Sequence, residues 1–239
     1  MDSVRCADRK GGMKMKQNKK KHLWMGIWFL LASLLWTALI RSVDVQAAGP
    51  TGTKVGFAAF NLWLHKLTGV HMTLYTITDW LGLVPIAVCL GFGMVGFFQL
   101  IRRKSLLMVD PDIILLGVYY ILVIIAYLVF EMVPVNYRPI LIGGVLEASY
   151  PSSTTLLVLS VMPTLKFQID RRAEKPLIRN AAGVFAIMFS AFMVTGRLIA
   201  GVHWATDIIG AIFLSRGLFL LYRYAACVTD RRREDRNGI

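Results

Sequence analysis

The stretch IILLGVYYILVIIAYLVFEMV, residues 113–133, contains one charged residue, Glu131, in 21 positions. A helix needs about 20 mainly apolar residues to cross the roughly 30 Å hydrocarbon core of a bilayer. This stretch therefore predicts a membrane-spanning helix. The whole chain has the same character, since 56% of its 239 residues are hydrophobic and its mean hydropathy is +0.58. These values exclude an ordinary soluble domain.

Six apolar stretches lead us to predict an all-α, polytopic membrane protein with a six-helix transmembrane bundle. Basic tails are expected at residues 1–22 and 226–239, on either side of a six-span membrane domain at 23–225. Outside the spans, apolar residues at helical spacing in 54–70 predict an amphipathic helix at the outer interface. The fourth span is short and holds a proline. The predicted spans are residues 23–40, 80–101, 113–133, 152–167, 181–200 and 207–225.

The net charge of +13 is unevenly distributed along the chain. Of the 27 Lys and Arg residues, 21 lie in segments that one topology places on the same side: 1–22, 102–112, 166–180 and 223–239. Positive residues favour the cytoplasmic side, so both termini are expected in the cytoplasm of a plasma-membrane protein. We attribute the charge to topology and to contact with the lipid bilayer rather than to nucleic-acid binding. Residues 23–40 exceed a usual signal-peptide core and favour a retained anchor, with cleavage near Ala47 as the alternative.

Three polar clusters face the opposite, outer side in this topology. They are VPVNYRPIL (133–141), EASYPSSTT (147–155) and GRLIAGVHWATD (196–207). Ionisable residues next to apolar spans are costly unless they are paired, hydrated or functional. The convergence of three such clusters predicts a functional site at this side.

The third cluster has the residues of an activated nucleophile. His203 and Asp207 are four residues apart and share a helix face, so the carboxylate can hold one imidazole nitrogen and leave the other free. Arg197 lies beyond a bend that Gly201 would permit, and a guanidinium suits phosphate oxygens. A buried ion-pair network is the alternative interpretation of these charges.

The other clusters add groups that bind anions. Ser152 and Ser153 lie at the start of an apolar helix, where free backbone N–H groups attract phosphate, although a plain Ser/Thr cap would give the same pattern. Arg138 supplies a second guanidinium beside Pro139. Together the clusters predict phosphoryl chemistry.

These residues resemble the type 2 phosphatidic-acid phosphatase superfamily, which includes bacterial haloperoxidases and lipid phosphate phosphatases. Its three motifs are K-x6-R-P, P-S-G-H and S-R-x5-H-x3-D. This chain has E-x6-R-P over 131–139, P-S-S-T over 151–154 and G-R-x5-H-x3-D over 196–207. The resemblance covers about residues 55–225, and the third motif is its most specific part.

The resemblance implies a membrane lipid phosphatase that forms a phosphohistidine without a metal or other cofactor. His203 would be the nucleophile and Asp207 would orient it. The phosphate oxygens of a phospholipid or polyprenyl phosphate would be held by Arg138, Ser152, Ser153 and Arg197.

Four motif positions differ from this pattern, and two of them change the chemistry. Glu131 replaces a phosphate-binding lysine, and Thr154 replaces the histidine that protonates the leaving group. The candidate substitute acids are Glu147 and Thr154 itself, with Glu131, Tyr150 and His71 also on the outer side. The alternative function is a non-catalytic relative that binds or moves phospholipids. The other two of the four differences are Gly196 in place of a serine and Ser153 in place of a glycine, and we expect both to be tolerated.

Overall fold

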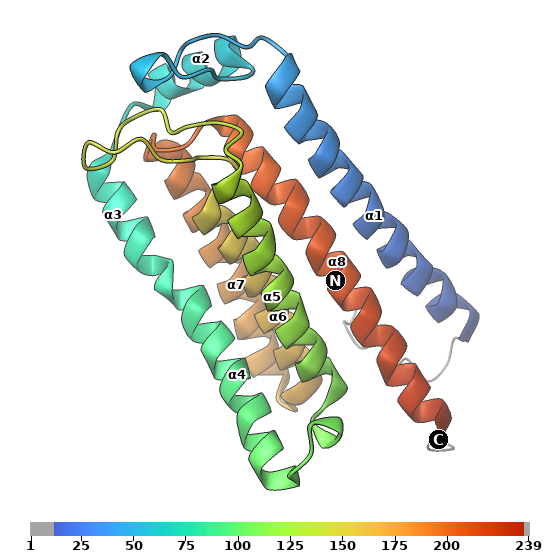
Figure 1. Cartoon of the computed structure of the whole chain (residues 1–239). Helices are drawn as coiled ribbons and strands as arrows, with labels where there is room; N and C mark the ends of the chain where they lie inside the picture. The colour runs from blue at the N-terminus through green and yellow to red at the C-terminus, as the bar shows by residue number, and fades with distance from the viewer. Residues whose placement is uncertain (1–11, 237–239) are drawn as a thin grey trace.

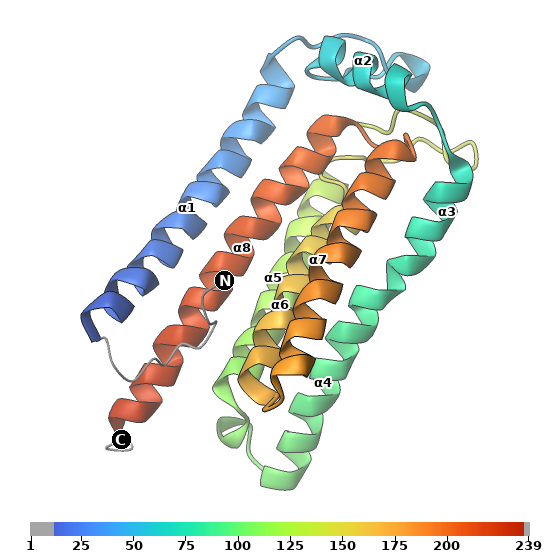
Figure 2. The same ribbon diagram turned by 180° about the vertical axis from the view of Figure 1, so that it is seen from behind.

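The computed structural model describes residues 12–236, with side chains described over residues 20–230, and it is helical throughout this range apart from loops and isolated bridges. Figures 1 and 2 show a bundle of long helices with a short helix lying across one end. Short 3-10 turns occur at Pro50–Gly52 and Leu106–Met108. The α-helices are α1 (Gly12–Ser42), α2 (Ala58–Thr68), α3 (Met72–Leu81), α4 (Leu83–Arg103), α5 (Pro111–Met132), α6 (Ser153–Arg172), α7 (Pro176–Ile199) and α8 (Ala205–Arg236).

The all-α membrane fold is confirmed. Five helical segments within the described residues are long and apolar enough to cross a bilayer: Lys20–Ser42, Met72–Arg103, Pro111–Met132, Pro176–Ile199 and Ala205–Asp230. The fourth predicted span, now helix α6, is not among them. The count of six spans therefore stays a prediction, as do the boundaries of the membrane domain and its tails.

Helix α6 is less apolar because it occupies the centre of the bundle, packed against α4, α5, α7 and α8. Its polar groups find partners there. The Tyr119 hydroxyl donates to the Ser160 carbonyl (2.9 Å), and the Tyr120 and Thr164 hydroxyls lie 2.7 Å apart. Gln168 donates to the Tyr222 hydroxyl (2.6 Å). A buried polar group is tolerated when it is hydrogen-bonded, so low hydropathy is compatible with this central position.

Helix α1 packs along the outside of the bundle against α8 (Figures 1 and 2). The two helices approach closely at glycines. A Cβ atom on Gly26 would lie 2.9 Å from the Leu221 side chain, and one on Gly217 would lie 2.7 Å from Leu30. Small residues allow such backbone approach between membrane helices. The α1–α8 pair is therefore a defined contact rather than a loose association.

Helix α2 confirms the amphipathic helix expected within residues 54–70, and it lies across the end of the bundle (Figure 1). Phe60, Trp63 and Leu67 are exposed on it. Asn61 is buried and donates to the Gly56 carbonyl (2.8 Å) and to the Thr206 hydroxyl at the start of α8 (3.0 Å). Helix α2 thus braces the end of the bundle where the polar clusters lie.

Candidate active site

A polar cavity of about 200 Å³ lies at this end of the bundle. All three polar clusters contribute to it: Arg138 follows α5, Glu147 and Ser149 precede α6, Ser153 begins α6, and His203 lies between α7 and α8. The predicted convergence of the clusters is thus observed. The rest of the lining comes from Tyr127, Phe130, Glu131, Ala148, Tyr150 and Pro151.

A tight turn between α7 and α8 positions His203. Gly201 has φ +69°, and a Cβ atom there would lie 2.0 Å from the Gly69 carbonyl oxygen, so only glycine fits. The bend predicted at Gly201 is therefore present. His65 Nε2 lies 3.0 Å from the Gly201 carbonyl, and Trp204 Nε1 donates to the Tyr137 carbonyl (2.7 Å). These contacts hold the loop that carries His203.

The two nitrogens of the buried His203 ring face opposite kinds of group. Nδ1 lies 3.1 Å from the Ser149 carbonyl oxygen and 3.8 Å from Asp207 Oδ2. Nε2 lies 3.4 Å from Arg197 Nη2 and 3.5 Å from Arg138 Nη1. Acceptors around Nδ1 and donors around Nε2 indicate the tautomer with the proton on Nδ1. The Nε2 lone pair then points toward the two guanidinium groups, where an anion would bind.

The environment keeps this imidazole neutral. Burial lowers the pKa of His203 well below its ordinary value, and the charges of Arg138 and Arg197 lower it further, against the hydrogen bond to Ser149. A neutral imidazole is the nucleophilic form. His203 is therefore suited to attack at neutral pH.

Lowering the pH from 7.5 to 5.5 is expected to destabilise the protein through His203. The unfolded chain gains a proton on this imidazole near pH 6.5, whereas the folded pKa is well below that value. Stability is therefore lost as the pH falls below about 6.5, by up to about 1.4 kcal/mol per pH unit. Thermal unfolding in detergent across this range measures the slope. A His203→Gln variant should lose this part of the slope, and an unchanged slope would contradict a neutral buried imidazole.

Asp207 is fully buried but is not the closest partner of His203. Its Oδ2 accepts the Trp204 backbone N–H (2.9 Å) and its Oδ1 accepts from Asn136 Nδ2 (3.2 Å). The Ser149 carbonyl is the nearer acceptor for His203 Nδ1. Asp207 thus shapes the loop and faces Nδ1 from 3.8 Å, and its predicted role in orienting the imidazole stays a prediction.

Arg197 is a buried cation with unused hydrogen-bonding capacity. It is 1% exposed, and its Nε and Nη1 have no hydrogen-bond partner among the described residues. Its guanidinium lies 4.9 Å from the centre of the Tyr75 ring, and Nη1 lies 3.6 Å from Asp79 Oδ1. The Asp79 side chain is 59% exposed, so Arg197 is only partly compensated.

Arg138 is buried on the other side of the His203 ring. Its Nε lies 2.8 Å from Glu147 Oε2, an ion-pair distance, although the N–H direction makes no hydrogen bond. The Arg138 backbone N–H donates to the Glu147 carbonyl (3.0 Å). Glu147, a predicted substitute acid, thus lines the cavity directly beside a predicted phosphate-binding arginine.

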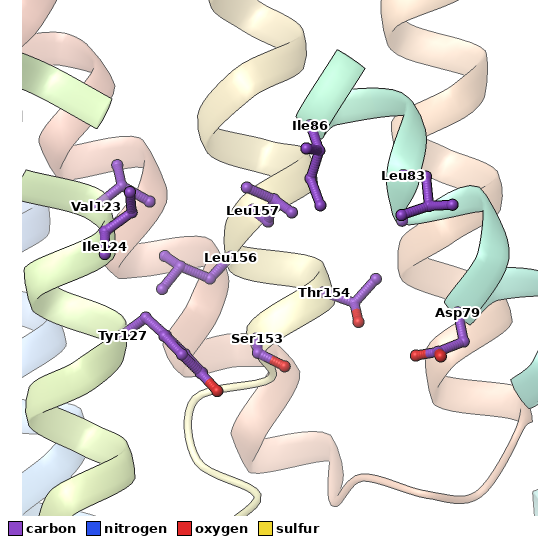
Figure 3. Close-up of a pocket in the computed structure, with 11 residues that line it drawn as sticks. Asp79, Leu83, Ile86, Val123, Ile124, Tyr127, Ser153, Thr154, Leu156 and Leu157 are labelled. Carbon is purple, nitrogen blue, oxygen red and sulfur yellow. The ribbon is translucent and has the colours of Figure 1, made fainter. Parts of the chain in front are cut away.

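The start of α6 borders both the polar cavity and an apolar groove of about 280 Å³, whose lining residues are shown in Figure 3. Ser153 and Tyr127 line both spaces. Thr154 lines only the groove, on the side of α6 that faces Asp79 (Figure 3). Ser152 is fully buried, and its hydroxyl donates to the Thr155 hydroxyl (3.0 Å). The cavity thus contains Ser153 but neither the Thr154 nor the Ser152 side chain.

No family model matches the chain, and none of the curated proteins matches it significantly. Among solved structures, the chain is similar to a transmembrane PAP2 type phosphatidylglycerolphosphate phosphatase from Bacillus subtilis. The two chains share a fold. The TM-score is 0.55 at 17% sequence identity, and the match covers 83% of this chain and 94% of that chain. The likeness supports the fold expected from the motifs and leaves the roles of individual residues as proposals.

Sequence reasoning missed four residues around His203 and the arginines. Asp79 is a charge directly before the second predicted span, a position that could have marked it. Asn136 and Ser149 lie inside the quoted clusters, but only the fold shows that they contact Asp207 and His203. Tyr75 has no signal in the sequence, because a ring that stacks on an arginine resembles any interfacial tyrosine.

Proposed function

We propose that the protein is an integral-membrane lipid phosphatase whose His203 takes the phosphoryl group from a lipid phosphate or diphosphate. The observation that carries the proposal is the His203 Nε2 atom, which faces the buried guanidinium groups of Arg138 and Arg197 at a polar cavity lined by His203 and Arg138. An ion-pair network has no need for a neutral imidazole between two cations. A phosphoryl-transfer site does, because it must hold the phosphate and attack it.

The reaction follows from this arrangement. Arg138, Arg197 and the free N–H groups at the start of α6 hold the phosphate oxygens. His203 Nε2 forms a bond to phosphorus as the bond to the leaving oxygen breaks, and the Ser149 carbonyl and Asp207 stabilise the positive ring. Water then attacks phosphorus, the P–N bond breaks and inorganic phosphate leaves. No residue in this sequence of steps needs a metal ion.

The apolar groove beside the cavity fits the hydrocarbon part of the same substrate. Leu83, Ile86 and Leu157 line it, together with apolar residues of α5. A phosphate in the polar cavity would place its lipid chain past Ser153 and Tyr127, which line both spaces. The site would thus take its substrate from the membrane, at the outer leaflet if the positive-inside topology holds.

Thr154 occupies the position at which the resembling family has the histidine that protonates the leaving group, so the leaving group would have to depart without that proton donor. A threonine hydroxyl is a very weak acid, and a positioned acid is typically worth about 10² to 10⁴ in rate. Glu147 lines the cavity beside Arg138, and Asp79 lies near Thr154 in the groove. A lipid diphosphate needs little protonation of its leaving group, because attack on its terminal phosphorus releases a lipid monophosphate that is stable as an anion. We therefore expect a diphosphate to be a better substrate than a simple phosphomonoester.

A lipid-binding role without turnover is the second candidate. It is favoured by carboxylates that already face both arginines, Glu147 at Arg138 and Asp79 at Arg197. A bound phosphate would compete with these carboxylates. Such a site could hold a phospholipid headgroup and release it unchanged.

Phosphate release by the purified protein separates the two functions. Phosphatidate, phosphatidylglycerol phosphate and an isoprenyl diphosphate would be compared in detergent with a chelator present. We expect release from the diphosphate, and a Thr154→His variant should raise monoester turnover by about 10². Release by neither protein from any substrate would reject the phosphatase and favour the lipid-binding role. Release only by Thr154→His would indicate an intact pocket that lacks its acid.

A further inference from the structure

A group of cationic side chains lies between α1 and α8, far from the candidate active site. Arg216 and Arg223 are seven residues apart on α8, about 10 Å along the axis and on one face. His22 of α1 is within electrostatic reach of both, and of its neighbour Lys21. The close approach of α1 and α8 at Gly26 and Gly217 brings these side chains together.

Among residues 20–230, no carboxylate lies within ion-pair distance of Arg216, Arg223 or His22. No ion pair or hydrogen bond joins Arg216 or Arg223 to another part of the chain that the structure describes, and Arg223 Nε and His22 Nδ1 are buried without a hydrogen-bond partner. The Asp170 carboxylate interacts electrostatically with Arg223 but forms its ion pair with Lys166. The local charge is therefore strongly positive.

Neighbouring arginines at the same end of the bundle are paired. Arg171 contacts Asp230 (2.7 Å) and Arg172 contacts Asp112 (2.9 Å). Carboxylates of the chain thus neutralise these two arginines, which lie at the same end of the bundle. Arg216 and Arg223 thus differ from these arginines in having no ion pair with any carboxylate of residues 20–230, which leaves them able to bind an added anion.

The depth of Arg216 identifies the source of that anion. It lies 11 residues after the start of α8, about 16 Å along the helix, inside an apolar membrane span, and its side chain is exposed on the surface of the bundle. A charge facing hydrocarbon is costly unless its side chain reaches the interface or an anion. Arginine pairs well with phosphate, and lipid phosphates are the anions that border the hydrocarbon.

We propose that Arg216, Arg223 and His22 bind the phosphate of an anionic phospholipid in the leaflet opposite the candidate active site. Arg216 extends along α8 toward the headgroup and Arg223 meets it nearer the interface. Because α1 packs chiefly on α8, a lipid held by both helices ties α1 to the bundle. An anionic lipid should therefore stabilise the protein, and this inference is independent of the proposed catalytic function.

Thermal unfolding in non-ionic detergent tests the site. With added phosphatidylglycerol, the unfolding temperature is expected to rise by about 3 °C above that with the same amount of phosphatidylcholine. A variant with both Arg216→Gln and Arg223→Gln should lose this rise. A control with Arg102→Gln and Arg179→Gln removes two cations at the same end of the bundle, neither of them ion-paired with a carboxylate, and should keep it.

A second variant tests the same site in case the double variant does not fold. Arg216→Leu places an apolar side chain on a lipid-exposed position, so it should fold at least as well in phosphatidylcholine and respond less to phosphatidylglycerol. An equal response to both lipids in the native protein, or a full response in either variant, would overturn the proposal. A rise of the same size with inorganic phosphate alone would overturn the assignment to a lipid headgroup.

Discussion

Replacing His203 by glutamine is expected to reduce phosphate release by about three orders of magnitude or more, because it removes the nucleophile itself. Glutamine can still donate to the Ser149 carbonyl, but it offers no nitrogen lone pair toward Arg138 and Arg197. Steady-state release of phosphate from an isoprenyl diphosphate measures the loss. Substrate binding should persist, since the phosphate-binding groups remain.

A matched control distinguishes this effect from general damage to a histidine-bearing loop. His71, one of the candidate acids named from the sequence, does not line the polar cavity and is exposed at the same end of the bundle, with Nε2 2.8 Å from the Thr68 carbonyl. The His71→Gln variant should retain wild-type turnover. Substantial turnover in His203→Gln, with the substrate preference unchanged, would show that another group carries the chemistry.

The second large effect is expected at Arg197. The Arg197→Gln variant should lose about 10² to 10³ in kcat/KM, the usual result of removing one donor that stabilises charge in the transition state. Its stability should not fall. The native guanidinium is buried with two nitrogens unbonded, so it is costly to the fold, and Asp79 is exposed enough to remain hydrated without it.

Activity and unfolding temperature should therefore separate in this variant. Both would be measured on the same preparations, with Arg102→Gln as the control, because Arg102 is exposed at the opposite end of α4. The opposite pattern, a marked fall in unfolding temperature with little loss of kcat/KM, would identify Arg197 as part of a structural ion-pair network.

Much of the site could be predicted from local sequence because its central residues lie close together in the chain. The bend at Gly201 and the spacing of Arg197 and His203 are local properties, and the structure places Arg197 Nη2 3.4 Å from His203 Nε2. The all-α membrane fold followed equally directly from long apolar stretches. Both predictions depend on interactions within one segment.

Contacts between segments could not be predicted in the same way. The i, i+4 spacing suggested Asp207 as the direct partner of His203, but the loop geometry brings the Ser149 carbonyl closer. Thr154 was expected among the cavity residues, yet the helical rotation of α6 turns it into the groove. The hydropathy of α6 was ambiguous because its polar groups are satisfied by tyrosines of α5 and α8, which the sequence of α6 cannot show.

Arg216 had no explanation from the sequence, since its surroundings depend on how α1 packs against α8. The structure supplies a group of unpaired cations there and hence a testable role. Arg223 thus belongs both to the charge pattern that predicts the membrane topology and to the cationic group that is proposed to bind lipid.

The central claim is tested most directly by trapping the covalent intermediate. The protein would be mixed with a lipid diphosphate carrying a radiolabelled terminal phosphate, quenched in alkali within milliseconds and digested. We expect label on the peptide containing His203, stable to base and lost in acid, and absent from His203→Gln. Continued turnover without labelled protein, or label on a different residue, would contradict the account.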